Sequence, residues 1–148
     1  MAITTTEKTN ILKLIATMFN LAPSAAIYAD IATSYEGAGN SLSVLATNLS
    51  ASGVFINKYG SLDNAAKAAL LLSDLGLTTG TTAGDAASAY FTDRLALGVT
   101  IDQIAVEAVT YLTDDTKRNA AFDDLALALT NKATVAQALI DSGIVAAT

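Results

Sequence analysis

The sequence predicts an all-α fold, a compact bundle of about seven or eight short helices in a single domain over residues 1–148. Alanine, the residue with the highest helix propensity, makes up about a fifth of the chain. Apolar residues recur at the three- and four-residue spacing of an amphipathic helix, and no convincing alternating strand is present. Hydroxyl-bearing residues precede many of these stretches and glycines follow them, as expected of helix caps.

The first helix begins at a capping box, with Thr4 as N-cap and Glu7 three residues later. A buried stripe follows, made of Ile11, Leu12, Leu14, Ile15, Met18 and Phe19. At this spacing core packing explains Met18 and Phe19 better than a ligand pocket does.

The second helix is expected over residues 23–35, because Pro23 suits the first turn of a helix. It ends at the glycine-rich stretch 36–39. Tyr28 and Tyr35 lie on one face with Ile31. We interpret them as amphipathic residues at the edge of the core, in preference to a contact surface for a glycan.

Asn40 or Ser41 can cap a third helix, for which Gly53 is a plausible C-terminal residue. Its apolar positions are Leu42, Leu45, Ala46 and Leu49. Residues 54–56 (VFI) then form a short apolar plug.

Ser61 can cap a fourth helix, whose apolar residues at 65–72 wrap most of its circumference, so we expect it to be the most buried helix. The Gly/Thr-rich stretch 77–84 is the best hinge candidate, between subdomains 1–76 and 82–148. It is not a phosphate loop, because the required lysine and spacing are missing.

Thr82, with Asp85 three residues on, can open a fifth helix that stops at Gly98. Thr100 and Gln103 form a second capping box. The cleanest helical stripe in the chain follows: Ile101, Ile104, Ala105, Ala108, Val109 and Leu112.

A polar turn at residues 113–116 precedes two further predicted helices. The first runs through Phe122, Leu125, Ala126 and Leu129, and the second, after Asn131 and Lys132, through Val135, Ala136, Leu139 and Ile140. Gly143 ends the last helix, and residues 144–148 form a short tail.

A local repeat links two of these helices. Residues 39–46 and 98–105 share the pattern G-x-[ST]-h-x-x-h-A, where h is apolar, and a helix with a tyrosine (Tyr28 or Tyr90) precedes each copy. The pattern encodes a glycine stop, a hydroxyl cap and a new helix. We interpret it as a sign of two related helix-turn-helix halves, although capping alone makes such patterns common.

The residue types argue against an enzyme. Without His or Cys, the chain cannot build a Ser-His or Cys-His nucleophile, and a zinc site would need carboxylates alone. A glycosidase could use paired carboxylates, but it also needs aromatic subsites, and the chain has no Trp. We therefore expect no catalytic residues.

Calcium is the one cofactor that the sequence leaves open. The candidate oxygen ligands are Asp114, Asp115, Asp123 and Asp124, which lack the spacing of an EF-hand. For Asp114 and Asp115 a position at a helix N-terminus is the simpler explanation, because the helix dipole favours acidic residues there.

Charge and hydropathy limit the partners. The net charge is −6 and no basic cluster is visible, so we expect neither nucleic-acid binding nor binding to anionic membranes. Mean hydropathy is +0.45, yet no apolar stretch is long enough for a membrane span. The N-terminus lacks the basic and apolar regions of a cleavable signal peptide.

The stretch 18–55 resembles the α-helical modules of bacterial S-layer proteins, RTX-type adhesins and other type I secreted surface proteins. Those modules contain an aromatic-bearing helix, an A-P-[SD] corner, a Tyr/Trp helix, G-x-[ST]-h and a closing S-x-x-F. The matching residues are Phe19, 22–24, Tyr28, 39–42 and 52–55. Later pieces similar to the N-terminal segments of such proteins are 72–77, 89–91, 98–100 and 129–132.

The resemblance implies export through a one-step type I exporter and a place on the cell surface or in the extracellular matrix. In S-layer relatives this region anchors the lattice to surface polysaccharide. The chain departs from the family because it has no G-G-x-G-x-D calcium-binding repeats.

We therefore expect an extracellular structural protein that self-assembles into a surface layer, sheet or filament. The alternative is a monomeric binding module for cell-surface polysaccharide. An intracellular helical adaptor is a more distant third hypothesis.

Overall fold

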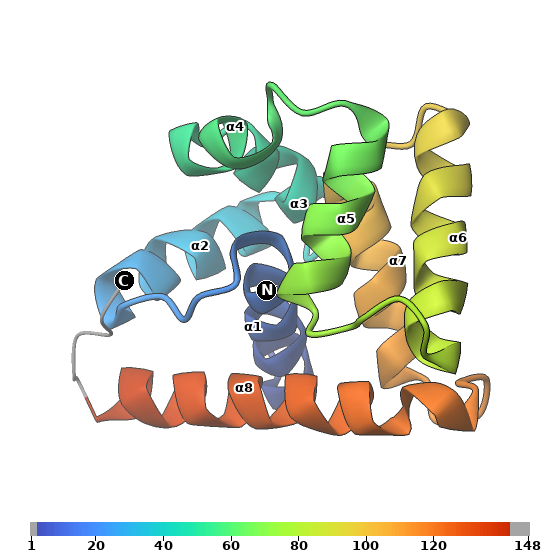
Figure 1. The fold of residues 1–148 in the computed structure, drawn as a ribbon. Coiled ribbons are helices and arrows are strands. Elements are labelled where there is room, and N and C mark those ends of the chain that lie inside the picture. Colours follow the sequence, from blue (N-terminus) through green and yellow to red (C-terminus); the bar gives the residue numbers. More distant parts are fainter. Residues whose placement is uncertain (1–2, 143–148) are drawn as a thin grey trace.

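The computed structural model describes residues 3–142 and confirms the all-α prediction (Figure 1). Within that range it contains eight α-helices, one 3-10 helix and no strand. The elements are α1 (Thr5–Phe19), α2 (Ala25–Gly37), α3 (Leu42–Ser50), α4 (Gly53–Tyr59), α5 (Asn64–Asp74), α6 (Thr82–Ala96), α7 (Ile101–Thr113), the 3-10 helix η1 (Ala120–Phe122) and α8 (Asp123–Asp141).

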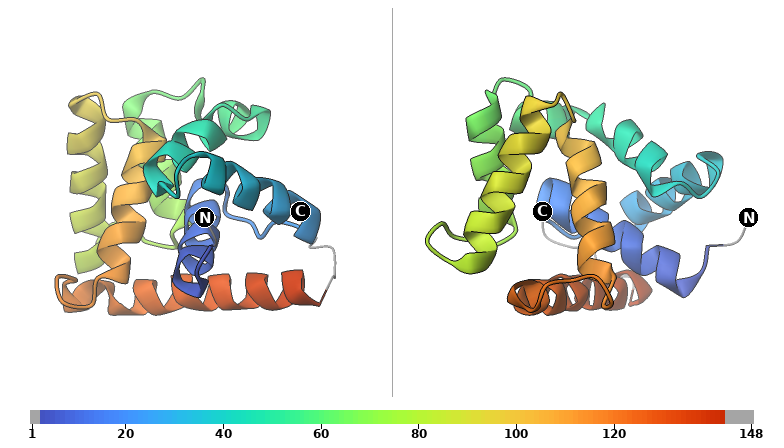
Figure 2. Two further views of the ribbon diagram at one scale, coloured as in Figure 1. Left: turned by 180° about the vertical axis from the view of Figure 1, so that it is seen from behind. Right: turned by 90° about the vertical axis from the view of Figure 1, so that its right-hand side faces the viewer.

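Helix α8 runs along one side of the molecule, and the remaining helices pack above it (Figure 1). Helix α1 crosses α8 at a steep angle: α1 is seen nearly end-on in Figure 1, and α8 is seen end-on in the right-hand view of Figure 2. Helix α1 packs chiefly on α8 and α7, while α3 packs on α7 and α5 packs on α6. Helix α4 lies at the end of the molecule opposite α8 (Figures 1 and 2).

Helix α1 is the most buried helix. Every residue from Ile11 to Met18 is buried, including Lys13 and Thr17. The hydroxyl of Thr17 donates to the carbonyl of Lys13 (2.8 Å), which satisfies a polar group in the core. Met18 is fully buried, as its spacing predicted.

The prediction that the helix after Ser61 would be the most buried is wrong. Helix α5 buries Ala68, Leu71 and Leu72, but its remaining alanines are at least partly exposed. The apolar residues that wrap its circumference are largely alanines, and alanine tolerates exposure because it presents little apolar surface.

The predicted capping box of the first helix is confirmed, and it extends into a larger network. Thr4 Oγ1 accepts from the Glu7 backbone N–H, and Glu7 Oε1 accepts from the Thr4 backbone N–H, both at 3.1 Å. Glu7 Oε2 also accepts from the Tyr35 hydroxyl (2.7 Å) and the Asn40 side-chain amide (3.0 Å). One carboxylate therefore ties the start of α1 to the end of α2.

Serine side chains cap three helices. Ser24 caps α2, so this helix begins at Ala25 and not at Pro23, which lies just outside it. Of the two candidates for α3, Ser41 is the cap. Ser52 caps α4, so Gly53 opens a helix that contains the predicted apolar plug.

Two other caps differ from the predicted residues by one or two positions. Asp63, not Ser61, caps α5 with a 2.9 Å bond to a backbone N–H. Thr81, not Thr82, caps α6. Several adjacent residues in each stretch carry suitable side chains, so local sequence alone does not choose among them.

The Gly/Thr-rich loop at 77–84 is tied down by its own polar groups. Asp85 accepts from the Gly80 backbone N–H (2.8 Å), and the Thr81 hydroxyl donates to the Thr78 carbonyl (2.7 Å). At Gly84 an added Cβ would lie 1.7 Å from that same carbonyl oxygen. The main hydrophobic core contains residues from both sides of the loop, so the two predicted subdomains share one core.

The predicted Thr100–Gln103 capping box is wrong. Thr100 is the N-cap of α7, but its side chain makes no capping bond. The amide of Gln103 instead reaches α3, where it donates to the Ser43 carbonyl (3.1 Å) and the Thr47 hydroxyl (3.0 Å). A longer-range partner has replaced the local one.

The two copies of the repeat lie against each other, because α3 packs on α7. Each copy starts with a glycine in the left-handed region, Gly39 (φ 72°) and Gly98 (φ 87°). The alanines that end the two patterns, Ala46 and Ala105, are both fully buried. Their small side chains allow the two helices to approach closely.

The two helices predicted at the C-terminal end are one continuous helix, α8. Asn131 and Lys132, which suggested a break, are exposed residues within it that line a hollow together with residues of α1. Phe122 belongs to the 3-10 turn that precedes α8. The predicted stop at Gly143 and the tail at 144–148 lie outside the described residues.

The Glu7 network predicts a specific pH dependence. Hydrogen bonds, the largest from Tyr35, lower the pKa of Glu7 from 4.5 to about 2, while burial and the carboxylate raise that of Tyr35 to about 12. A lowered folded-state pKa stabilises the protein above pH 4.5, and this stabilisation is lost as the pH falls towards 2. Urea unfolding should show that the stability difference between wild type and Glu7→Gln shrinks over this range.

Tyr35→Phe serves as the partner variant in this experiment. Removing the Tyr35 hydroxyl deletes the largest cause of the lowered Glu7 pKa. In the Tyr35→Phe background the stabilisation by Glu7 should therefore be lost at a higher pH than in the wild type. A stability difference between wild type and Glu7→Gln that stays constant from pH 6 to pH 2 would contradict the prediction.

Alanine should have opposite effects on stability at Gly84 in α6 and at Gly37 in α2. Gly84→Ala should lower the free energy of unfolding by roughly 2 kcal/mol or more, because its Cβ would overlap the Thr78 carbonyl. At Gly37, the last residue of α2, nothing lies within 4 Å of an added Cβ. Gly37→Ala should raise stability by about 0.5 kcal/mol. Denaturant titrations of both variants test this contrast.

Candidate functional site

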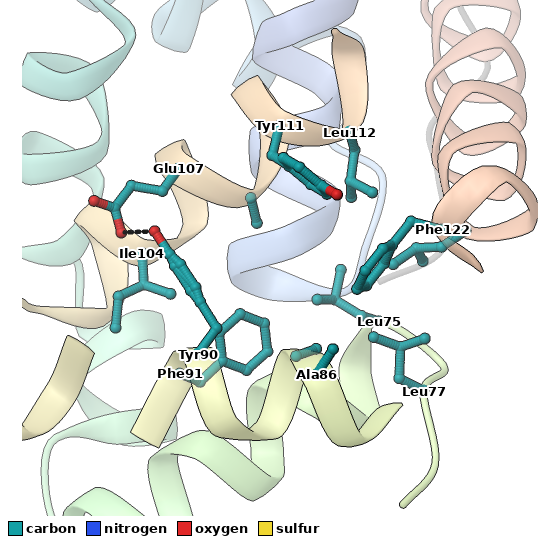
Figure 3. A pocket seen from close by; sticks show the side chains of 13 residues that line it. Leu75, Leu77, Ala86, Tyr90, Phe91, Ile104, Glu107, Tyr111, Leu112 and Phe122 are labelled. Carbon is teal, nitrogen blue, oxygen red and sulfur yellow. Dashed lines mark hydrogen bonds between the residues drawn. The ribbon is translucent and has the colours of Figure 1, made fainter. Parts of the chain in front are cut away.

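A pocket of about 260 Å³ lies between α6 and α7, near the start of α8 (Figure 3). Apart from one carboxylate and two tyrosine hydroxyls, its lining is apolar. The lining residues are Leu75, Leu77, Ala86, Ala87, Tyr90, Phe91, Ile104, Glu107, Ala108, Tyr111, Leu112, Phe122 and Leu125.

The pocket exists because α6 and α7 diverge. The two helices meet at the turn around Gly98 and spread apart toward α8, as the right-hand view of Figure 2 shows. Helix α6 packs mainly on α5 and makes only a few contacts with α7. Alanines at 86, 87 and 108 line the gap, so no long side chain fills it.

A charged pair bridges the two helices beside the pocket. Arg94 on α6 forms an ion pair with Glu107 on α7, and its Nε donates to Glu107 Oε1 at 3.0 Å. The Tyr90 hydroxyl donates to the same oxygen at 2.9 Å (Figure 3). The bond to Glu107 raises the pKa of Arg94, and burial followed by that carboxylate raises the pKa of Tyr90. The positive charge of Arg94 therefore balances the negative charge of the Glu107 carboxylate.

Aromatic rings form much of the wall. Tyr111 meets Phe122 edge to face, with ring centroids 5.6 Å apart, and Tyr90 lies 6.3 Å from Phe91. The Tyr111 hydroxyl accepts from the backbone N–H of Asn119 at 2.8 Å, which holds the turn before η1. Tyr90 and Tyr111 are 39% and 37% exposed, so the pocket opens to solvent beside them.

The four candidate calcium ligands lie around the turn between α7 and α8, where the positively charged side chain of Arg118 already binds two of them. Arg118 donates to Asp115 (2.7 Å), Asp123 (2.9 Å) and the Leu112 carbonyl (2.8 Å). Asp114 accepts from the backbone and hydroxyl of Thr116, which lowers its pKa.

The prediction that Asp114 and Asp115 lie at a helix N-terminus is wrong, because Asp114 is the C-cap of α7. Asp123 and Asp124 do lie in the first turn of α8, where the helix dipole favours acidic side chains. Among residues 3–142, no group of three or more His, Cys, Asp or Glu side chains is arranged to hold a metal ion.

Two apolar surfaces lie at opposite ends of the molecule. The first, called here the α4 surface, consists of exposed Val54 and Ile56 on α4 and exposed Leu97 at the α6–α7 turn. Ile56 and residues 98–102 line one shallow hollow of about 360 Å³, and Val54 and Leu97 are not among its lining residues.

The second, called the α8 surface, is the solvent-facing side of α8 (Figure 1). Its residues recur at the spacing of one helix face, and all are exposed and uncharged. They are Leu127, Ala128, Asn131, Thr134, Val135 and Ala138.

Neither the pocket nor the two surfaces was predicted from the sequence. The aromatic residues and alanines of the pocket have the spacing of ordinary core positions, and the sequence singles out Tyr90 only through the repeat and the family resemblance. On α8 the sequence pattern is misleading, because Val135 is predicted to lie on the apolar stripe of a separate last helix but its side chain is 59% exposed.

Comparisons with protein-family models, curated proteins and solved structures found no match to this chain. In the part of the chain that the structure describes, no helix combines the length and the apolar character needed to cross a membrane.

Arg118 should be important for stability, because its side chain is only 14% exposed and joins three acceptors. Arg118→Gln should lower the thermal midpoint by about 3–6 °C. Lys117→Gln, which removes the same charge from an exposed neighbour, is the matched control and should have a much smaller effect. Equal shifts in the two variants would show that charge alone matters.

Proposed function

We propose that this protein is an extracellular structural protein that assembles with copies of itself into a layer, sheet or filament. The observation that carries the proposal is the pair of apolar surfaces at opposite ends of the molecule, the α4 surface and the α8 surface. Contacts between unlike surfaces on opposite ends repeat without closing, and such contacts build open filaments.

Charge explains why assembly would use these surfaces. Two copies with a net charge of −6 repel each other over most of their area. The α8 surface is uncharged over more than three helical turns, so copies can approach there at little electrostatic cost. Burying a fully exposed Val or Leu side chain contributes about 1.5–3 kcal/mol. Each end offers at least two large apolar side chains that are more than half exposed, so each of them contributes part of this amount.

Opposite charges lie beside the two surfaces. Lys67 lines the hollow next to Ile56, and Asp124 is exposed near the start of the α8 surface. Asp102, a carboxylate in the lining of the same hollow, is buried. A head-to-tail contact would bring these opposite charges near each other.

The location outside the cell and export through a one-step type I exporter rest on the resemblance to S-layer and type I secreted proteins. Calcium bridging between acidic copies is part of the same proposal, with the aspartates around Arg118 as candidate ligands.

Binding of surface polysaccharide by a monomer is the alternative. Its first candidates, Tyr28 and Tyr35, are buried, so the exposed rings of Tyr90 and Tyr111 would have to form the stacking surface. Retention of the wild type on cell-envelope polysaccharide, and loss of that retention in Tyr90→Ala and Tyr111→Ala, would favour this alternative.

Negative-stain microscopy and light scattering of the purified protein, with and without calcium, test self-assembly. The wild type should form extended assemblies. Leu127→Glu/Val135→Glu and Val54→Glu/Ile56→Glu should each abolish them while helix content is retained. Thr130→Glu, an exposed position on the flank of α8, is the control and should still assemble.

Mixing the two double variants distinguishes head-to-tail assembly from other modes. Each variant keeps one intact surface, so an equimolar mixture should form dimers with one copy of each variant and nothing longer. Monodisperse wild-type monomers in both calcium conditions would overturn the proposed function.

A further inference from the structure

We propose that the pocket between α6 and α7 binds a small, uncharged aromatic molecule of one or two fused rings that carries a single hydroxyl group. This inference is independent of self-assembly, because neither the α4 surface nor the α8 surface contributes to the pocket.

The volume sets the size of the guest. The pocket measures about 260 Å³, and a cavity of about 150 Å³ lined by Leu, Ile and Phe holds one benzene ring. Protein interiors contain few voids larger than a water molecule. An apolar space of this size, kept open by alanines where leucines would fill it, is therefore suited to a guest of one or two rings.

The walls set the shape of the guest. Four aromatic rings, from Tyr90, Phe91, Tyr111 and Phe122, line the pocket from α6, α7 and η1 (Figure 3). Aromatic rings favour offset-stacked or edge-to-face neighbours, and Tyr111 and Phe122 already meet in the second way. A flat aromatic guest can make the same kinds of contact with several of these rings at once.

Electrostatics sets the charge of the guest. Glu107 is the one charged residue among the lining side chains, and Arg94 together with the Tyr90 hydroxyl neutralises it. An ion would lose its hydration in this pocket without gaining a counter-charge. An uncharged molecule loses far less.

Two hydroxyls at the mouth of the pocket set the polar group. The Tyr90 hydroxyl uses its hydrogen on Glu107, so it can still accept a hydrogen bond. The Tyr111 hydroxyl accepts from Asn119, so its hydrogen can still be donated. A hydroxyl on the guest can act as either partner while its rings enter the apolar part.

The test uses 2-naphthol as the probe and follows protein methyl groups by NMR. The methyl resonances of Ile104 and Leu112, both buried in the pocket wall, should shift and saturate with a dissociation constant on the order of 0.1–1 mM. Methyl groups of Ile11, in the core around α1, should not shift. Working with Leu127→Glu/Val135→Glu keeps any assembly from interfering.

Three variants locate the site. Ala108→Leu and Ala86→Phe place larger side chains in the pocket from α7 and α6, and each should weaken binding at least tenfold. Ala89→Leu, at an exposed position of α6 outside the lining, should bind as the wild type does. Circular dichroism checks that each variant is folded. Because Ala108→Leu and Ala86→Phe fill the pocket independently, the test still works if one of them misfolds.

The anion 2-naphthalenesulfonate, which has the same rings, tests the predicted neutrality and should bind at least tenfold more weakly. Absence of saturable shifts with 2-naphthol would overturn the proposal. So would equal affinities of the two filled variants and Ala89→Leu, or an affinity for the sulfonate that matches that for 2-naphthol.

Discussion

The complete burial of α1 is the constraint on which the rest of the structure depends. From Ile11 to Met18 no residue faces solvent, so the helix needs neighbours on every side. Helices α7 and α8 provide the largest of these contacts, and α3, α4 and α5 complete the enclosure. Because α8 comes last in the chain, the core closes only when both ends of the sequence have come together. The burial of Lys13 and Thr17 follows from the same enclosure.

A single carboxylate sets how α2 is placed relative to α1. Glu7 accepts hydrogen bonds from Thr4, Tyr35 and Asn40, groups that come from the start of α1, the end of α2 and the turn that follows. On the other side of the molecule, Glu107 joins Tyr90 and Arg94 across α6 and α7 in a related way. In both places an acidic residue accepts from a tyrosine of the helix that precedes a glycine stop. The acidic residue differs in origin, since Glu7 comes from α1, outside the α2–α3 unit, and Glu107 comes from α7 itself.

Close packing in one place and loose packing in another explain how the molecule combines a firm core with a pocket. Ala46 and Ala105 let α3 lie closely against α7 and are fully buried. Alanines on the facing sides of α6 and α7 have no such partner, since these helices diverge from their turn and leave the space between them open. The same residue type therefore produces contact or emptiness, depending on the angle between the helices.

The sequence by itself determined the helical class, nearly all of the helices and the first capping box, because propensity, periodicity and capping act within a few residues. It did not determine which of several neighbouring polar residues caps α5 or α6, or that Asn131 and Lys132 continue a helix. Gln103 shows the reason: its local capping partner lost to Ser43 and Thr47, 60 and 56 residues away. Only the tertiary structure decided the pocket and the two end surfaces, since the pocket depends on the angle between α6 and α7, and the surfaces depend on which helix faces the other helices leave uncovered.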